Sequence, residues 1–275
     1  MTRLRSLPEG WYPSTAAGVR ERCRDWERSL PPVESRFRAV VVPHAGWVFS
    51  GELAYRAIRA LEQDAHTVVV AGGHLRPDDP VMLAPEPAYE TPLGPLEADT
   101  GLAESIKRRL EVQDDRLPDN TVEVQLPIVR HLFPSARALY LRCPPGPQAI
   151  VLGRVVAELA IEHGETICLV GSTDLTHYGP AYGYVPAGVG PDAVRWVRDQ
   201  NDRPIVDAMV GMDARETIRL GVEKRAACSS GAAAAAIAFA RYLGATEGVL
   251  LEYATSYDVR PDRSFVGYAA VGYAA

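Results

Sequence analysis

The sequence lacks the features that mark a membrane protein or a disulfide-stabilised one. It has only four cysteines in 275 residues, and none form a C-x-x-C pair, which argues against a disulfide framework and against a structural zinc knuckle. Long hydrophobic runs are also missing. The longest small apolar run, residues 232–240, is too short to cross a bilayer, and the first residues contain no apolar signal segment. We therefore expect a cytoplasmic protein with no membrane partner.

Positive charge is not in excess either. The formal net charge is -6, whereas binding to a nucleic-acid backbone normally requires clustered Lys and Arg. The arginines at 20, 22, 24 and 28 alternate with Glu21, Asp25 and Glu27, which indicates a solvated helix face. We expect no nucleic-acid partner, and the sequence leaves the oligomeric state open.

The composition is that of a globular protein with a substantial core. Hydrophobic residues make up 47% of the chain and charged residues 23%, and the 22 prolines are spread along it. The length fits either one domain or two tightly packed halves. Because there is no internal repeat and no long linker, we predict a single domain over residues 1–275.

Short β-branched runs alternate with longer stretches of helical periodicity. This pattern predicts a three-layer α/β/α sandwich with a mostly parallel central sheet. The predicted strands are 37–42, 67–71, 136–141, 166–171, 248–254 and 265–273, the last of them antiparallel. The predicted helices are 51–62, 100–110, 121–132, 148–163 and 232–243.

Chemically active side chains follow three of these strands. His44, His74 and the pair Asp174/His177 each come just after a predicted strand. In open α/β sheets ligands bind beyond the carboxyl ends of the strands, so these side chains are expected to gather at one edge with Cys228. Cys228 precedes a predicted helix, whose N-terminus would favour its thiolate.

Imidazole, carboxylate and thiolate groups together suit iron, copper or zinc. Each residue also has an ordinary structural interpretation. A single His after a strand is more often a hydrogen-bonding loop residue, Asp174 could form a turn or helix cap, and Cys228 could be a small buried apolar residue.

Several segments in order resemble motifs of the Memo-like family (AmmeMemoRadiSam system protein B). VPHAGWVFSG at 42–51 resembles the family's PHAGY-x-Y-S-G, and GGH at 72–74 resembles its G-P/N-x-H turn. VEVQLP at 122–127, STDLTHYG at 172–179 and ACSSG at 227–231 resemble three further motifs. The opening WYP at 11–13 and the segments YATS at 253–256 and VGYAA at 266–270 extend the likeness over nearly the whole chain.

The resemblance implies a fold like that of the class III extradiol dioxygenases, which open catechol rings with non-haem iron(II). Carried over by motif, it implies that His44, His74 and Cys228 hold the metal, Fe(II) first with Cu or Zn as alternatives, while Asp174 and His177 line the same pocket. We assign His177 as acid/base and Asp174 as the group that orients it.

We further expect the substrate to contact Trp47, Glu123 and Tyr178. The aromatic side chains near the site, Phe49 and Tyr182 included, could equally stack on an aromatic substrate or pack against one another. One departure concerns the motif E-H-S, where this chain has Asp119, Asn120 and Thr121. The family's histidine is thus replaced by Asn120, which implies an altered substrate pocket.

The sequence therefore predicts a metal-dependent oxidoreductase, most similar to a non-haem iron(II) dioxygenase, with a small chelating aromatic substrate and O2 as partners. Two alternatives stay open at this point. The same residues would serve a metal-dependent hydrolase, in which the cation deprotonates a bound water. The protein could also be a metal-binding or partner-binding module without turnover, since fold similarity does not transfer function.

Overall fold

A single mixed sheet forms the middle layer of the molecule. The structure is a computed structural model, and it describes residues 1–31 and 36–275. Within that part of the chain the sheet has the order β10-β11-β1-β8-β2-β7-β3-β6, and β9 pairs with β11. The four central strands, β1, β8, β2 and β7, run parallel, whereas the flanking pairs β1–β11, β10–β11 and β3–β7 are antiparallel.

The central strands are short and almost entirely apolar, as expected for strands that helices cover on both faces. The strands of the sheet are β1 (Ala39–Val42), β2 (Thr67–Gly72), β3 (Val81–Leu83), β6 (Val112–Asp114), β7 (Arg137–Arg142), β8 (Ile167–Ser172), β9 (His177–Tyr178), β10 (Gly248–Thr255) and β11 (Phe265–Tyr273). A separate two-stranded ribbon consists of β4 (Ala88–Tyr89) and β5 (Leu96–Glu97).

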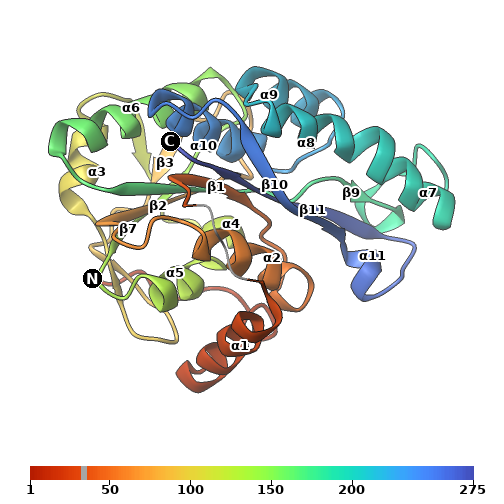
Figure 1. Cartoon of the computed structure of the whole chain (residues 1–275), viewed down its shortest axis with the longest axis horizontal. Coiled ribbons are helices and arrows are strands. Elements are labelled where there is room, and N and C mark those ends of the chain that lie inside the picture. Colours follow the sequence, from red (N-terminus) through yellow and green to blue (C-terminus); the bar gives the residue numbers. More distant parts are fainter. Residues whose placement is uncertain (32–35) are drawn as a thin grey trace.

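Helices cover both faces of the sheet (Figure 1). One face carries α3 (Thr100–Lys107), α6 (Pro147–His163), α8 (Arg203–Val210), α9 (Ala214–Glu223) and α10 (Ser230–Tyr242). The other face carries α1 (Ala16–Ser29), α2 (Trp47–Arg59), α4 (Asn120–Glu123) and α5 (Leu126–Leu132). At the end of the molecule near β9 lie α7 (Pro191–Trp196), the 3-10 turn Pro180–Tyr182, the π-helical segment Val197–Asp202 and α11 (Ser256–Val259).

Two separate hydrophobic clusters fill the spaces between the layers. The alternate residues of β1 divide between them: Ala39 and Val41 face the cluster under α6 and α10, while Val40 and Val42 face the cluster under α1 and α2. The predicted three-layer α/β/α sandwich with a mostly parallel sheet is thereby confirmed.

Two predicted elements differ from the observed ones for identifiable reasons. The predicted helix at 121–132 is two helices, α4 and α5, because Pro127 has no backbone N–H to donate to the carbonyl one turn earlier and instead lies in the first turn of a new helix. The predicted helix at 51–62 begins earlier, at Trp47, since the carbonyl of Gly46 already accepts the first helical hydrogen bonds from Phe49 and Ser50. The helices between 191 and 223 were not predicted.

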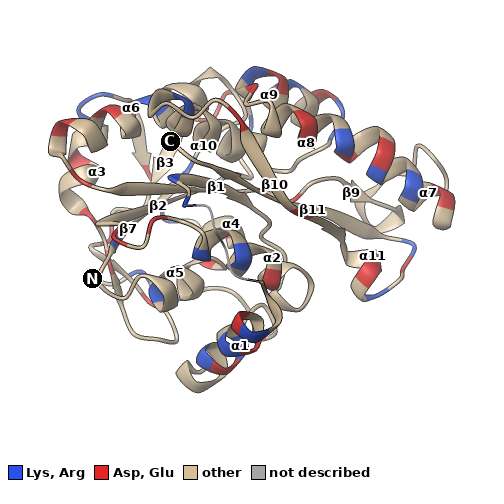
Figure 2. Cartoon of the chain, viewed as in Figure 1, with Lys and Arg blue, Asp and Glu red and all other residues tan. Residues whose placement is uncertain are grey.

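Charge on the surface follows the sequence pattern. The four arginines of α1 are exposed while Val19, Cys23 and Trp26 are buried. Blue and red segments alternate along this helix in Figure 2, as expected for a solvated face. No helix among the described residues combines the length and apolarity needed to cross a bilayer.

Candidate metal and substrate site

Three neighbouring parallel strands end at the same place and each delivers one polar side chain. His44, His74 and Asp174 all lie two residues beyond the last residue of their strands, β1, β2 and β8. Because β8 pairs with both β1 and β2, the three chain ends are adjacent. Cys228 joins them from the segment before α10, where its backbone N–H donates to the carbonyl of Asp174 at 3.2 Å.

His44 is fully enclosed and held at both ring nitrogens. Its side chain is 1% exposed, its Nδ1 lies 3.3 Å from Ser172 Oγ, and its Nε2 lies 3.2 Å from Cys228 Sγ. Its backbone N–H donates to Asp174 Oδ1 at 2.7 Å. A neutral ring that donates Nδ1–H to Ser172 keeps the Nε2 lone pair pointed at the side where Cys228 lies.

His74 is fixed by a carboxylate behind it. Its Nδ1 lies 3.3 Å from Asp119 Oδ2, and its ring meets that of His44 edge-on with centroids 5.1 Å apart. Asp119 is in turn 3.4 Å from Arg142, which also pairs with the buried Asp115. A carboxylate that accepts Nδ1–H from a histidine leaves Nε2 free as a ligand, an arrangement common around protein-bound metals.

The turn that carries His74 accepts only small residues. An added Cβ on Gly72 would lie 2.0 Å from Thr121 Oγ1, and one on Gly73 would lie 2.5 Å from Ser229 Cβ. His74 itself has a φ of 57°, in the left-handed region that non-glycine residues seldom occupy. The backbone around this histidine is thus constrained by its close approach to the segment that follows Cys228.

Cys228 is surrounded by imidazoles. Burial alone would raise the pKa of its thiol, but His44, His177 and His74 together hold that pKa well below its usual value. Burial likewise favours the neutral ring of His74, but Asp119 and the Cys228 thiolate raise its pKa to about 10. Burial also lowers the pKa of His44, but the neighbouring Cys228 and Asp174 raise it above its usual value. Attraction between the Cys228 sulfur and the neighbouring rings thus stabilises the charged thiolate and imidazolium forms against the effect of burial.

The donor set fits a cation. One ligand atom from each of His44, His74 and Cys228 lies within 4.8 Å of the other two. A cation with bonds of roughly 2.0–2.3 Å holds its ligands up to about 4.5 Å apart, so the grouping of these three atoms is compatible with one shared cation. Two imidazoles and a thiolate suit zinc, copper or iron rather than calcium or magnesium.

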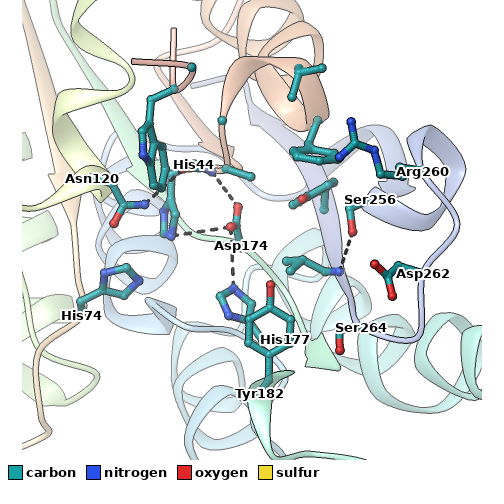
Figure 3. A pocket seen from close by; sticks show the side chains of 18 of the residues that line it. His44, His74, Asn120, Asp174, His177, Tyr182, Ser256, Arg260, Asp262 and Ser264 are labelled. Atoms are coloured by element: carbon teal, nitrogen blue, oxygen red, sulfur yellow. Dashed lines mark hydrogen bonds and ion pairs between the residues drawn. The ribbon is translucent and has the colours of Figure 1, made fainter. Parts of the chain in front are cut away.

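Asp174 and His177 lie beside these three residues. Asp174 Oδ2 is 3.9 Å from His44 Nε2 and 3.7 Å from His177 Nε2, and Figure 3 shows the carboxylate between the two rings. The Nε2 atom of His177 is buried and has no hydrogen-bond partner among the described residues. Although burial favours its neutral form, Asp174 and the Cys228 thiolate raise the pKa of His177 to about 10.

A cavity of about 690 Å³ opens over this cluster. His44, His74, Asp174 and His177 line one part of it, and Asn120 lies on the same side (Figure 3). Part of the remaining wall is aromatic and apolar, with Trp11, Phe49, Tyr182, Val266 and Tyr268, and part of it is polar. Asn120 donates from its side chain to the carbonyl of His44 at 3.3 Å. A second cavity of about 250 Å³ reaches Cys228 and His177 past Arg225 and Ala227.

The three residues expected to contact substrate lie outside the large cavity. Trp47 packs against Trp26 and donates its Nε1–H to the carbonyl of Val124 at 3.1 Å. Glu123 accepts the backbone N–H groups of Ser6 and Leu7 and the hydroxyl of Tyr12.

Tyr178, the third of them, is fully buried and stacks on Phe265. Its hydroxyl donates to the carbonyl of Gly188 at 2.9 Å. The structure favours packing roles for Trp47, Glu123 and Tyr178, because each is satisfied by contacts within the fold.

The sequence interpretation missed the residues that support His74. Asp119 had been noted only as part of a departure from a motif, and Arg142 was not singled out at all. A signal for Arg142 did exist, since it is a charged residue at the end of an apolar strand, β7, with its side chain 5% exposed. A buried Arg requires carboxylate partners, which here are Asp115 and Asp119.

A second group of possible ligands lies at the opposite end of β2. It consists of His66, Asp99 and Glu165. Asp99 already accepts hydrogen bonds from the hydroxyl of Thr67 and from the N–H of Leu102, where it caps α3. These contacts explain the position of Asp99 without a cation.

The family assignment follows from comparison with known proteins. The model of the family described as "Memo-like protein" matches residues 3–272. The chain belongs to the Memo-like family. The predicted resemblance is therefore confirmed over almost the entire sequence.

Archaeal members of the MEMO1 family are similar along most of their length. A MEMO1 family protein of Thermococcus onnurineus is 34% identical over 254 residues, 86% of this chain and 87% of that protein. One from Methanothermobacter thermautotrophicus is 33% identical over 288 residues, covering 98% of this chain and 99% of the other. The similarity therefore extends over most of each of these proteins and of this chain.

A solved structure is similar at the level of the fold alone. The crystal structure of the uncharacterized protein JW3007 from Escherichia coli K12 has a TM-score of 0.57 with this Memo-like chain and 13% sequence identity. The match covers 86% of this chain and 99% of that one. It supports the α/β architecture and carries no information about activity.

Proposed function

We propose that this Memo-like protein is a metal-dependent oxidoreductase, similar to the non-haem iron(II) dioxygenases, that acts on a small chelating aromatic substrate. The observation that carries the proposal is the convergence of His44, His74 and Cys228 beneath an aromatic-walled cavity. Fe(II) is the cation proposed first, with copper and zinc as alternatives. When bound, such a cation would supply a Lewis acid and, if redox-active, a route to dioxygen.

The residues around the cluster would hold the substrate and exclude water. Phe49, Tyr182 and Tyr268 line the cavity and offer aromatic faces to a flat ring. The ring of Tyr182 lies 4.9 Å from that of His177, which limits where a substrate ring could rest. A substrate placed between these groups presents its polar edge to the histidine cluster.

His177 is proposed as the acid/base. Its unpartnered Nε2 would accept a proton from a substrate hydroxyl and later return it. Asp174, 3.7 Å from this atom, stabilises the imidazolium. A cation on Cys228 would neutralise the thiolate that raises the pKa of His177, so the histidine would titrate closer to neutral pH in the loaded protein.

The test is an oxygen-uptake assay on protein reconstituted anaerobically with Fe(II), with a panel of catechols. We expect substrate-dependent uptake in the parent protein. His177→Gln should retain iron and lose about 100-fold or more in rate, the range for removal of an acid/base group. His163→Gln, the same substitution at an exposed helix end, should leave the rate unchanged.

The donor set also supports a second candidate, a metal-dependent hydrolase. Cys and His are the usual protein ligands of Zn²⁺, and the three residues leave a coordination position for water. Zinc in the purified protein, hydrolysis of model esters and no oxygen uptake with Fe(II) would support that candidate and contradict the dioxygenase proposal. Tight metal binding with neither activity would point to a binding module.

A further inference from the structure

The large cavity has a second polar end, away from His74. Figure 3 shows Ser256, Arg260, Asp262 and Ser264 grouped on the side opposite His74 and Asn120. These residues come from α11 and from the segment that leads into β11. We call this group the distal end of the cavity. None of its residues belongs to the histidine and cysteine cluster.

Arg260 is the feature that gives this end its chemistry. Among the described residues that line the cavity it is the only Lys or Arg. No carboxylate in the described part of the chain lies within ion-pairing distance of its guanidinium. The guanidinium lies 6.0 Å from the centre of the Phe49 ring, and the backbone N–H of Arg260 donates to the carbonyl of Ser256 at 2.9 Å. Arg260 is exposed to solvent, so its guanidinium is accessible to a ligand that enters the cavity from this side.

Two hydroxyl groups lie at the same end and can act as donors. Ser256 Oγ accepts the backbone N–H of Val266 at 3.0 Å, and Ser264 Oγ accepts that of Ala181 at 3.0 Å. Each oxygen is fixed by this contact, and the hydroxyl hydrogen can turn toward the cavity. The guanidinium and the two hydroxyls together form a set of donors suited to an anionic oxygen group.

Asp262 restricts the charge of that group. Its carboxylate lines the same end of the cavity and would repel a doubly charged anion more strongly than a singly charged one. A carboxylate carries one negative charge and matches the planar guanidinium with two oxygens. The distal end therefore fits a carboxylate better than a phosphate.

We propose that Arg260 binds a carboxylate on the substrate, so that the substrate is an aromatic acid whose ring lies between the distal end and the histidine cluster. This identification of the substrate class rests on the proposed function, since that function supplies the aromatic chelating part. Phe49, Val266 and Tyr268 line the same cavity as the two polar ends and would contact the ring. Arg260 is accordingly a specificity-determining residue.

The first arm of the test compares two catechols that differ in a carboxylate. Binding of 3,4-dihydroxyphenylacetate and 4-methylcatechol to the zinc-loaded protein is measured by titration calorimetry, which avoids turnover. The parent protein should bind the acid more tightly than 4-methylcatechol. In Arg260→Gln the ratio of the two affinities should fall about tenfold. Asp262→Asn should increase the preference. Arg263→Gln, at an exposed neighbour that does not line the cavity, should leave it unchanged.

The second arm separates this inference from the proposed function. Metal-free protein is titrated with 3-phenylpropionate and with 3-phenylpropanol, and binding is followed by NMR. If the acid binds selectively and Arg260→Gln abolishes this binding, the carboxylate site is supported. If no catechol binds in the same protein, the proposed function fails while the carboxylate site stands. The assignment of Arg260 is wrong if acid and neutral probe bind equally in both arms, or if the preference for the acid survives Arg260→Gln. Catechol binding would in that case still support the proposed function.

Discussion

The Nε2 atom of His44 lies 3.2 Å from the Sγ atom of Cys228, although 184 residues separate them in the chain. His44 follows a central strand and Cys228 precedes the helix that packs most closely on α6. A histidine and a thiolate placed this close in a buried site are poised either to share a proton or to share a cation.

Because protons and a cation compete for the same side chains, metal affinity should depend on pH. The pKa values of His44 and His74 are raised in the metal-free cluster, that of His74 to about 10, while that of Cys228 is lowered. We therefore expect metal binding to displace protons mainly from the histidines. We expect affinity for Zn²⁺ to increase steadily from pH 6 to pH 9.

Titration calorimetry in buffers of different ionisation enthalpy measures the protons released per ion. Release of protons at neutral pH agrees with this account. An affinity that does not change over the same pH range would show that the histidines are neutral before the metal binds.

The carboxylate of Asp119 should contribute to metal affinity through His74. In Asp119→Asn the amide keeps an acceptor for the Thr121 N–H, but it no longer fixes the charge and tautomer of the His74 ring 3.3 Å away. We expect affinity to fall by about 10–100-fold, the usual effect of removing such a partner. Competition with a chelator of known affinity measures it.

Asp115→Asn provides the matched control for that substitution. It removes a carboxylate from the same network around Arg142, but Asp115 does not contact His74. This variant should unfold at a lower temperature and lose little metal affinity. If both variants lose affinity equally, the effect comes from general destabilisation.

A methyl group at Gly73 should disturb the site by separating its chain segments. The added Cβ would meet Ser229 Cβ and Oγ at 2.5 Å, so Gly73→Ala should destabilise the fold by about 1–3 kcal/mol, as overpacking does. Metal affinity should fall as well, since His74 and Cys228 are the residues next to the two positions. Addition of Ser229→Gly removes the contacting atoms and should restore much of both losses, whereas a double variant no better than Gly73→Ala would place the strain elsewhere.

The buried carboxyl of Asp202 should make the free energy of unfolding depend on pH. Burial raises the pKa of this carboxyl to about 7, against lowering contributions from Thr176 and Tyr253. Because the unfolded chain ionises at about pH 4, the carboxyl contributes most to stability below that pH and loses the contribution as the pH rises to about 7.

Asp202→Asn removes this titration. The free energy of unfolding of the variant, relative to the parent protein, should increase between pH 4 and pH 7 and level off above. Urea unfolding at several pH values measures this difference. A difference that is constant with pH would mean that Asp202 is ionised in the folded protein as readily as in the unfolded one.

The sequence predicted the parallel core of the fold because its signals there are local. Apolar residues fill each central strand, and in β1 and β2 they are β-branched, as in Val40 to Val42 and Val68 to Val70. Glycine, proline or polar residues follow these two strands. Strands of this kind can only lie in the centre of a covered sheet. The segment 191–223 lacked such a signal, because its helices border the edge of the sheet and are only partly buried.

The positions of His44 and His74 at one edge of the sheet could be predicted because residue type and position after a strand are both visible in the sequence, whereas the set of three candidate ligands came from the family resemblance. The supporting contacts could not be predicted. Asp119 precedes α4 and meets His74, which lies in a different turn. Arg260 lines the cavity from the position just after the short helix α11. Trp47 and Glu123 were expected to contact substrate because they stand in motifs, but a position in a motif does not determine which way a side chain points.

The central claim is that His44, His74 and Cys228 bind one cation together, and metal analysis of purified variants tests it most directly. Elemental analysis of the parent protein should find one transition-metal ion per chain. His44→Ala and Cys228→Ala should each lose it while remaining folded by circular dichroism, and His163→Ala should keep it. A folded His44→Ala variant that carries as much metal as the parent protein would contradict the account.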